Sequence, residues 1–162
     1  MDAFGNELNR LLVETYRIAG KIEQVMLEDL SDGNLTLSEM RALECVGDSR
    51  QRGITVTQIS QELNITPPSV TAMIKRLEKK GYVTKQRGTS GDGRQVLIRV
   101  TDMGWHAYVG YRFVQRRMIN AVRKSLSVEE GPMLMHALQG LNEFFRQKQA
   151  ELDGLAIRSE GE

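Results

Sequence analysis

Two helix patterns separated by only two residues place the strongest constraint on how this chain folds. The first pattern begins at Thr55, which forms a capping box with Gln58. The second follows Asn64-Ile65, with Thr66 as its N-cap and Pro67 at the first helical position, where a missing N–H costs no hydrogen bond. Two short helices joined by so tight a turn predict a helix-turn-helix unit.

The other elements follow from helical periodicity and from two runs rich in β-favouring residues. Expected helices and strands cover residues 4–30, 36–48, 55–63, 66–80, 82–86, 96–100, 101–124 and 127–149. Pro132 either distorts the last helix or moves its start to Gly131. The predicted fold is mainly α with a small β-hairpin, in the order α-α-α-α-β-β-α-α.

The outer helices have more apolar surface than one small core can bury. Apolar residues recur every three or four positions over residues 8–30, in a stripe too wide for a lone surface helix, and again over 108–145. These helices therefore need a partner surface. A self-contained helical bundle is the alternative interpretation.

Bulk properties exclude several classes of protein. No run approaches the ~20 apolar residues of a membrane span, and Cys45 is the single cysteine, so no internal disulfide can form and a cytoplasmic location is expected. His106 and His136 have no second ligand at metal-binding spacing. Because nothing pairs a nucleophile with a base, we expect neither an enzyme, nor a metal site, nor a cofactor.

Charge is distributed unevenly although the net charge is only +1. Residues 75–99 contain eight Lys and Arg but two acidic residues. This segment is either a contact surface for a polyanion or a solvated charged face.

A helical wheel of residues 66–80 separates an apolar side from a polar one. Val70, Met73, Ile74 and Leu77 face the expected core. The polar side and the helix start supply the candidate DNA-contacting residues Thr66, Ser69, Thr71, Ala72, Lys75, Arg76 and Lys79. Small groups at the start of such a helix suit close approach to base edges in the major groove. The early backbone amides, at the positive end of the helix dipole, suit a phosphate oxygen.

The hairpin at 84–100 has a glycine-rich tip that holds a single cation, Arg94, two residues after Asp92. Directly after a recognition helix, such a hairpin is typical of a wing that reaches the minor groove, where negative potential favours an arginine. We expect Asp92 to hold a nearby guanidinium or amide and so to shape the tip. An ordinary exposed hairpin with incidental charges is the alternative.

Across residues 35–104 the chain resembles the MarR family of bacterial transcriptional regulators. The matching segments are "LTLSEMRAL", "ITVTQISQELNITPPSVTAMIKRLEKKGYV" and "DGRQVLIRVTDMG". The resemblance implies an obligate homodimer, with the first and last two helices interlocked and two winged helices reading a pseudo-palindromic site in double-stranded DNA. Family roles carry over to Ser69, Thr71, Lys75, Arg76, Asp92 and Arg94.

Two departures from the family pattern affect DNA contacts. Pro67-Pro68 replaces polar residues at the start of the recognition helix and so removes donors from a base-reading position. Gly93 replaces an arginine often found between the wing's Asp and Arg, which removes one phosphate contact.

The segments "KIEQVMLEDL" and "LTLSEMRALECVG" resemble the branch of the family that represses fatty-acid-synthesis genes, in which acyl-carrier protein is the corepressor. An effector, either a small molecule or acyl-carrier protein, is therefore expected. Candidate lining residues for an effector pocket are Met26, Met40, Trp105 and Tyr108, and gap-filling in the core is the competing explanation for the methionines.

The sequence thus predicts a dimerisation helix at 1–34, a winged helix-turn-helix at 35–104, dimerisation helices at 105–150 and a frayed tail at 151–162. The expected function is a cytoplasmic, nucleoid-associated DNA-binding repressor, with recognition helix 66–80 and wing 84–100. The alternative is a winged-helix protein-interaction module without DNA binding.

Overall fold

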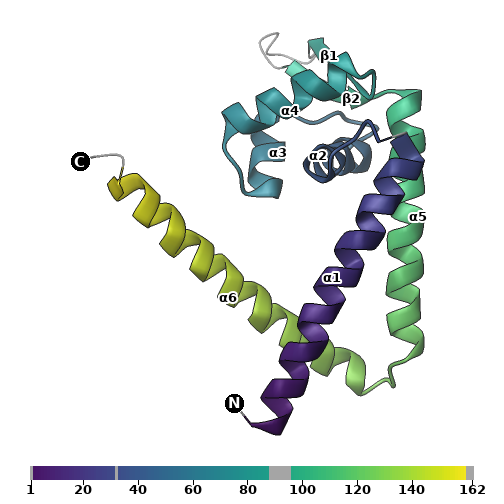
Figure 1. Ribbon diagram of the computed structural model, residues 1–162. Helices are drawn as coiled ribbons and strands as arrows, with labels where there is room; N and C mark the ends of the chain where they lie inside the picture. Colours follow the sequence, from purple (N-terminus) through teal and green to yellow (C-terminus); the bar gives the residue numbers. More distant parts are fainter. Residues whose placement is uncertain (1, 32, 88–95, 160–162) are drawn as a thin grey trace. The chain divides into compact units, whose positions relative to one another are not determined.

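The computed structural model describes residues 2–31, 33–87 and 96–159 and confirms the predicted order of elements (Figure 1). The elements are α1 (Ala3–Ser31), α2 (Leu37–Asp48), α3 (Val56–Leu63), α4 (Pro67–Lys79), β1 (Val83–Arg87), β2 (Val96–Val100), α5 (Asp102–Lys124) and α6 (Glu130–Ser159). The chain divides into two compact units, residues 1–115 and 116–162.

Local capping determines where the short helices begin. Both predicted capping boxes are present: Thr36 with Glu39 opens α2, and Thr55 with Gln58 opens α3. The tight turn after α3 is made by Asn64, whose left-handed conformation (φ 52°) ends the helix. These caps leave α2, α3 and α4 too short to stand alone, so they depend on packing against one another.

A single apolar core joins α2, α3, α4 and the hairpin. Its fully buried side chains include Met40, Leu43, Ile59, Ile74 and Leu77. We call residues 35–100, which contain these three helices and the hairpin, the reading head. This core holds α4 by one side only, so the opposite side of that helix is left to solvent.

The hairpin is antiparallel, with Val83 opposite Val100 and Arg87 opposite Val96. A third segment, which the sequence did not predict, completes the sheet: Ile54 bridges Ile98 through two backbone hydrogen bonds of 3.1 and 2.8 Å. A single bridging residue has no period-2 pattern, so only the tertiary contact reveals it.

α1 presents an apolar row that its own chain leaves in solvent. The row has the alternating three- and four-residue spacing of a coiled-coil seam. We call it the α1 seam; its members are Leu8, Leu11, Thr15, Ile18, Ile22 and Val25, and each of these side chains is exposed. Only near its C-terminal end, at Leu27 and Ser31, does α1 become buried.

In the second unit, α6 begins with the predicted capping box, in which the Ser127 N–H donates to Glu130 and the Glu130 N–H donates to Ser127. Pro132 falls in the first turn of this helix, where proline is tolerated. The expected frayed tail at 151–162 is replaced by helix through Ser159, because the segment after Gln149 is rich in good helix formers and Lys148 pairs with Glu151 at 2.7 Å. None of the described helices is both long and apolar enough to span a bilayer.

Candidate nucleic-acid interface

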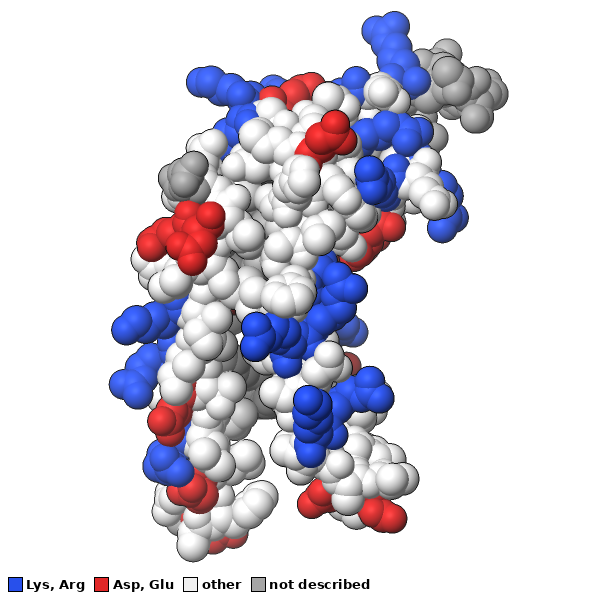
Figure 2. Space-filling view, turned by 90° about the vertical axis from the view of Figure 1, so that its right-hand side faces the viewer, with Lys and Arg blue, Asp and Glu red and all other residues white. Residues whose placement is uncertain are grey.

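The outward side of α4 presents an apolar half followed by a basic half. Val70, Met73, Ile74 and Leu77 are buried in the core. Diametrically opposite lies a stripe at i, i+4, i+7 and i+11 spacing, which we call the reading face: Pro68, Ala72, Lys75 and Lys79, all exposed. Lys and Arg side chains also crowd the surface around the hairpin, at the top of the view in Figure 2.

The hydroxyl groups at the start of α4 are hydrogen-bonded within the helix. The Thr66 and Ser69 hydroxyl oxygens lie 2.9 Å apart, and the Thr71 hydroxyl donates to the Pro67 carbonyl at 2.9 Å. Ser69 is exposed and Thr71 half-buried, so the structure brings all three predicted contacts to the helix start but gives each one an internal partner.

The backbone amides at the start of α4 are either missing or hydrogen-bonded within the helix. Pro67 and Pro68 have no N–H, the Ser69 N–H is capped by the Thr66 side chain, and the Val70 N–H donates to the Thr66 carbonyl at 3.1 Å. The predicted amide site for a phosphate oxygen therefore lacks its donors. The signal was present in the sequence, because two consecutive prolines remove the first two amides.

A buried carboxylate ties α4 to the start of α2. Glu39, only 1% exposed, accepts from Arg76 Nε at 2.9 Å and from Lys80 Nζ at 2.7 Å. Its Oε2 also accepts the Thr36 N–H, and Lys80 Nζ donates to the Asn34 carbonyl at 2.6 Å. Arg76, a predicted DNA contact, is thus anchored through Nε while its side chain stays 53% exposed.

Opposing influences act on the ionisation of Glu39. Burial alone raises the pKa of this carboxyl group. Hydrogen bonds from Lys80, the Thr36 backbone and Arg76, with the charge of Lys80, outweigh burial and hold the pKa of Glu39 below its usual value of 4.5. Glu39 is therefore a carboxylate at neutral pH, and it fixes the side-chain direction of Arg76.

The base of the hairpin is tied to the end of α4. Lys85 Nζ on β1 donates to Glu78 Oε2 at 2.5 Å. The predicted wing residues Asp92 and Arg94 lie outside the described residues, so their roles stay predictions. The base of the hairpin, where β1 begins at Val83, follows the C-terminal end of α4 after three residues.

Comparisons with known proteins agree with this arrangement. The sequence model described as "MarR family" matches residues 35–96, which spans nearly the whole reading head. The solved structure of Streptococcus pneumoniae FabT in complex with DNA has a TM-score of 0.75 and 25% sequence identity, covering 88% of this chain and 97% of that one. Residues 35–96 of this chain therefore resemble the MarR family, and its fold resembles that of FabT.

Two proteins of Bacillus subtilis (strain 168) are similar to this chain in sequence. The HTH-type transcriptional repressor YetL is 23% identical over 133 residues, 82% of this chain and 79% of YetL. The organic hydroperoxide resistance transcriptional regulator is 30% identical over 99 residues, 61% of this chain and 63% of that regulator. Both relatives are named as regulators of transcription.

The four candidate effector-pocket residues differ in their surroundings. Met40 is fully buried in the core, and Met26 is half-buried against it. Trp105 and Tyr108 stack with ring centroids 4.9 Å apart and line a surface hollow of about 390 Å³ with residues 47–52, at and after the end of α2. Because Met40 is enclosed, gap-filling in the core accounts for it.

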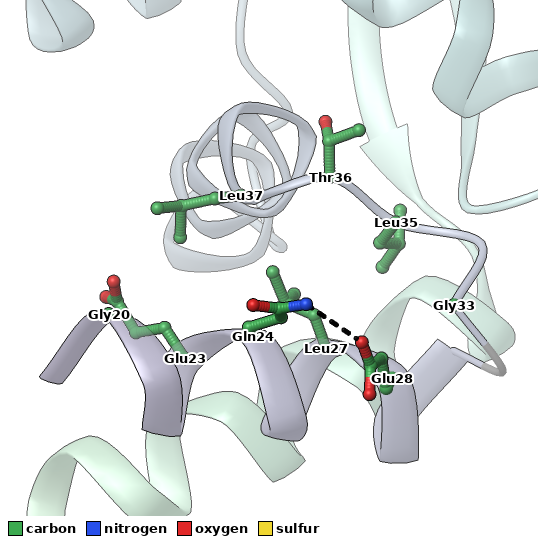
Figure 3. A pocket seen from close by; sticks show the side chains of 9 residues that line it. All are labelled: Gly20, Glu23, Gln24, Leu27, Glu28, Gly33, Leu35, Thr36 and Leu37. Carbon is green, nitrogen blue, oxygen red and sulfur yellow. Dashed lines mark hydrogen bonds between the residues drawn. The ribbon is translucent and has the colours of Figure 1, made fainter. Parts of the chain in front are cut away.

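A second cavity, of about 320 Å³, lies between the C-terminal half of α1 and the start of α2 (Figure 3). Leu27, Leu35 and Leu37 form its apolar part, while Glu23 and Glu28 bring carboxylates to it. Glu28 accepts a hydrogen bond from Gln24 at 3.2 Å. Two carboxylates at an open cavity disfavour an anionic ligand there.

Proposed function

We propose that this protein is a homodimeric, sequence-specific DNA-binding transcriptional repressor of the MarR family. The observation that carries the proposal is the exposed reading face of α4, with Lys75 and Lys79 on it and Arg76 at its edge, beside the base of a hairpin. A helix held by its apolar side and basic on its outer side suits the major groove, and the neighbouring hairpin suits the minor groove.

Dimerisation belongs to the proposal because the described residues of the first unit leave the α1 seam exposed. Five members of the seam are large apolar side chains that are 45–49% exposed. α6 adds further exposed apolar residues, among them Met135, Leu138 and Phe145. We assign residues 1–34 and 105–150 to the dimer interface. Two reading heads in one dimer would engage half-sites about one helical turn, ~34 Å, apart.

The proposal also includes an effector, either a small molecule or acyl-carrier protein. The 25% identity with S. pneumoniae FabT over 88% of this chain supports the fatty-acid-synthesis branch. Such a repressor would act on the bacterial nucleoid. The dimer would have two conformations that differ in the separation of its two α4 helices. An effector with unequal affinity for these conformations would change the affinity for the operator.

A salt titration of DNA binding tests the DNA-contacting residues. Fluorescence anisotropy with a duplex from upstream of the protein's own gene should show affinity falling steeply with salt. Lys75→Ala and Arg94→Ala should each lower the log–log slope by about one or less while the dimer persists. Lys21→Ala is the matched control, because Lys21 is an exposed lysine on α1. Slopes unchanged by both substitutions would contradict the assigned contacts.

One observation favours a second candidate, a winged-helix module that binds an acidic protein. At the start of α4, Pro67 and Pro68 have no N–H, and the Ser69 amide, the Val70 amide and the Thr71 hydroxyl donate within the helix, which leaves few donors for bases or phosphates. The two functions separate at low salt: a DNA-binding repressor retains random duplex DNA and prefers its own upstream region, whereas the protein-interaction module does neither.

A further inference from the structure

We propose that the reading face selects thymine, through the 5-methyl groups that thymine projects into the major groove. The inference rests on the proposed function and specifies which base edges its DNA site must offer. It concerns the first half of the reading face, Pro68 and Ala72, which precedes Lys75 on the same stripe.

The geometry places these two residues where bases would be closest. Buried Val70, Met73, Ile74 and Leu77 fix the inward side of α4, and Pro68 and Ala72 stand opposite, both exposed. They are four residues apart, which is about 6 Å along a helix axis, or roughly two base-pair steps. The N-terminal part of a recognition helix makes the base contacts, so Pro68 and Ala72 occupy the reading position.

The chemistry at this position is apolar. Pro68 offers ring methylenes and no N–H, and Ala72 offers one methyl group. The Thr71 hydroxyl donates to the Pro67 carbonyl, and one of the Thr66 and Ser69 hydroxyls donates to the other. The one hydroxyl donor that remains in this pair lies off the reading face, because neither residue is on its stripe. Pro68 and Ala72 have no side-chain donor, so these two positions read bases by apolar contact and not by hydrogen bonding.

Only one of the four bases offers an apolar group to such a face. In the major groove, adenine, guanine and cytosine present donors and acceptors, whereas thymine also presents its 5-methyl group. A donor or acceptor set against Pro68 and Ala72 would lose its water without gaining a partner. Lys75, the next residue on the stripe, supplies the donor for an acceptor one step further along.

Uracil substitution tests this inference directly, because uracil differs from thymine only by that methyl group. The full-length protein would first select its preferred duplex from a random library. That duplex is then synthesised with thymine or with deoxyuridine in one half-site, and affinity is measured by anisotropy at one salt concentration. We expect about threefold weaker binding per contacted methyl group, or about tenfold for two in one half-site. Deoxyuridine placed only outside the half-sites should have no effect.

Two matched variants assign the discrimination to the reading face. Pro68→Ser should reduce the tenfold thymine-to-uracil ratio to about threefold, because one apolar contact is lost. Pro67→Ser makes the same chemical change about 100° around the helix, off the reading face, and should keep the full ratio.

The outcomes separate this inference from the proposed function. Equal affinity for the thymine and uracil duplexes, a selected site without thymine in its half-sites, or a ratio unaffected by Pro68→Ser would each overturn the inference while DNA binding itself stands. Failure to select or bind any duplex would overturn both.

Discussion

Apolar side chains are mostly buried in the reading head and mostly exposed on the long helices α1 and α6. In the reading head, large apolar residues such as Leu43, Ile59 and Ile74 are fully buried within one chain. In α1 the seam residues stay about half exposed, and α6 has no buried residue among its described side chains. The reading head therefore owes its stability to its own chain, whereas the long helices need a second surface before they can contribute.

The largest expected effect comes from charging the α1 seam. Ile18→Glu combined with Ile22→Glu should prevent dimerisation and lower operator affinity about 10³-fold or more, because a single reading head loses the second half-site. Analytical ultracentrifugation and anisotropy measure the two effects. Lys21→Glu, on the same helix but off the seam, should leave the dimer intact. If the double variant stayed dimeric, the α1 seam would not be the surface that needs a partner.

Truncation inside the reading head should act on folding. Ile74→Ala removes a fully buried side chain and should lower the free energy of unfolding by about 2–5 kcal/mol, as measured by urea denaturation. Ile22→Ala is the control from the other region: because Ile22 is 48% exposed, its cost should depend on protein concentration, which reports loss of dimer contacts. A cost below ~1 kcal/mol for Ile74→Ala would count against a self-sufficient head.

Glu39→Gln tests whether the stability of the reading head depends on pH through the Glu39 ion pairs. Because the folded-state pKa of Glu39 lies below the unfolded value of 4.5, its carboxylate stabilises the fold fully above about pH 5, and this contribution is lost as pH falls through the folded pKa. The variant should be about 1–3 kcal/mol less stable than the parent at pH 7. The gap should narrow as the pH falls below 4.5. A gap independent of pH between 7 and 3 would contradict the ion-pair role.

Of these substitutions, Cys45→Ala should have the smallest effect on operator affinity. Burial, reinforced by Glu62, raises the pKa of this thiol to about 12, so the reactive thiolate is scarce at neutral pH. Iodoacetamide should alkylate Cys45 in the native protein at least about 100-fold more slowly than in urea. Operator affinity of Cys45→Ala should match the parent within twofold, with or without an organic hydroperoxide. A peroxide response that requires Cys45 would align this chain with its hydroperoxide-resistance relative instead.

Local signals predicted most of the fold, and contacts distant in sequence account for what was missed. The caps at Thr36, Thr55 and Thr66 are written within four residues each, so they were readable. The Ile54 bridge and the Glu39 ion pairs join residues 37 to 44 positions apart, and no periodic pattern records such a pairing.

The candidate site also has one part that the sequence predicted and one part that it did not. The polar side of α4 followed from the helical wheel, because helical spacing determines which residues face outward. The internal hydrogen bonds of Ser69 and Thr71 depend on side-chain rotamers, which the sequence does not specify.

The start of α5 is fastened to the junction of α4 and β1. The Thr101 hydroxyl donates to the Gly81 carbonyl at 2.7 Å, the Thr101 N–H donates to the Tyr82 carbonyl, and a side chain at Gly104 would collide with that same carbonyl. A displacement of α5 would consequently move α4 and the hairpin together. Regulation through α5 would reorient these two DNA-contacting elements as one rigid unit and would leave the distance between α4 and the hairpin unchanged.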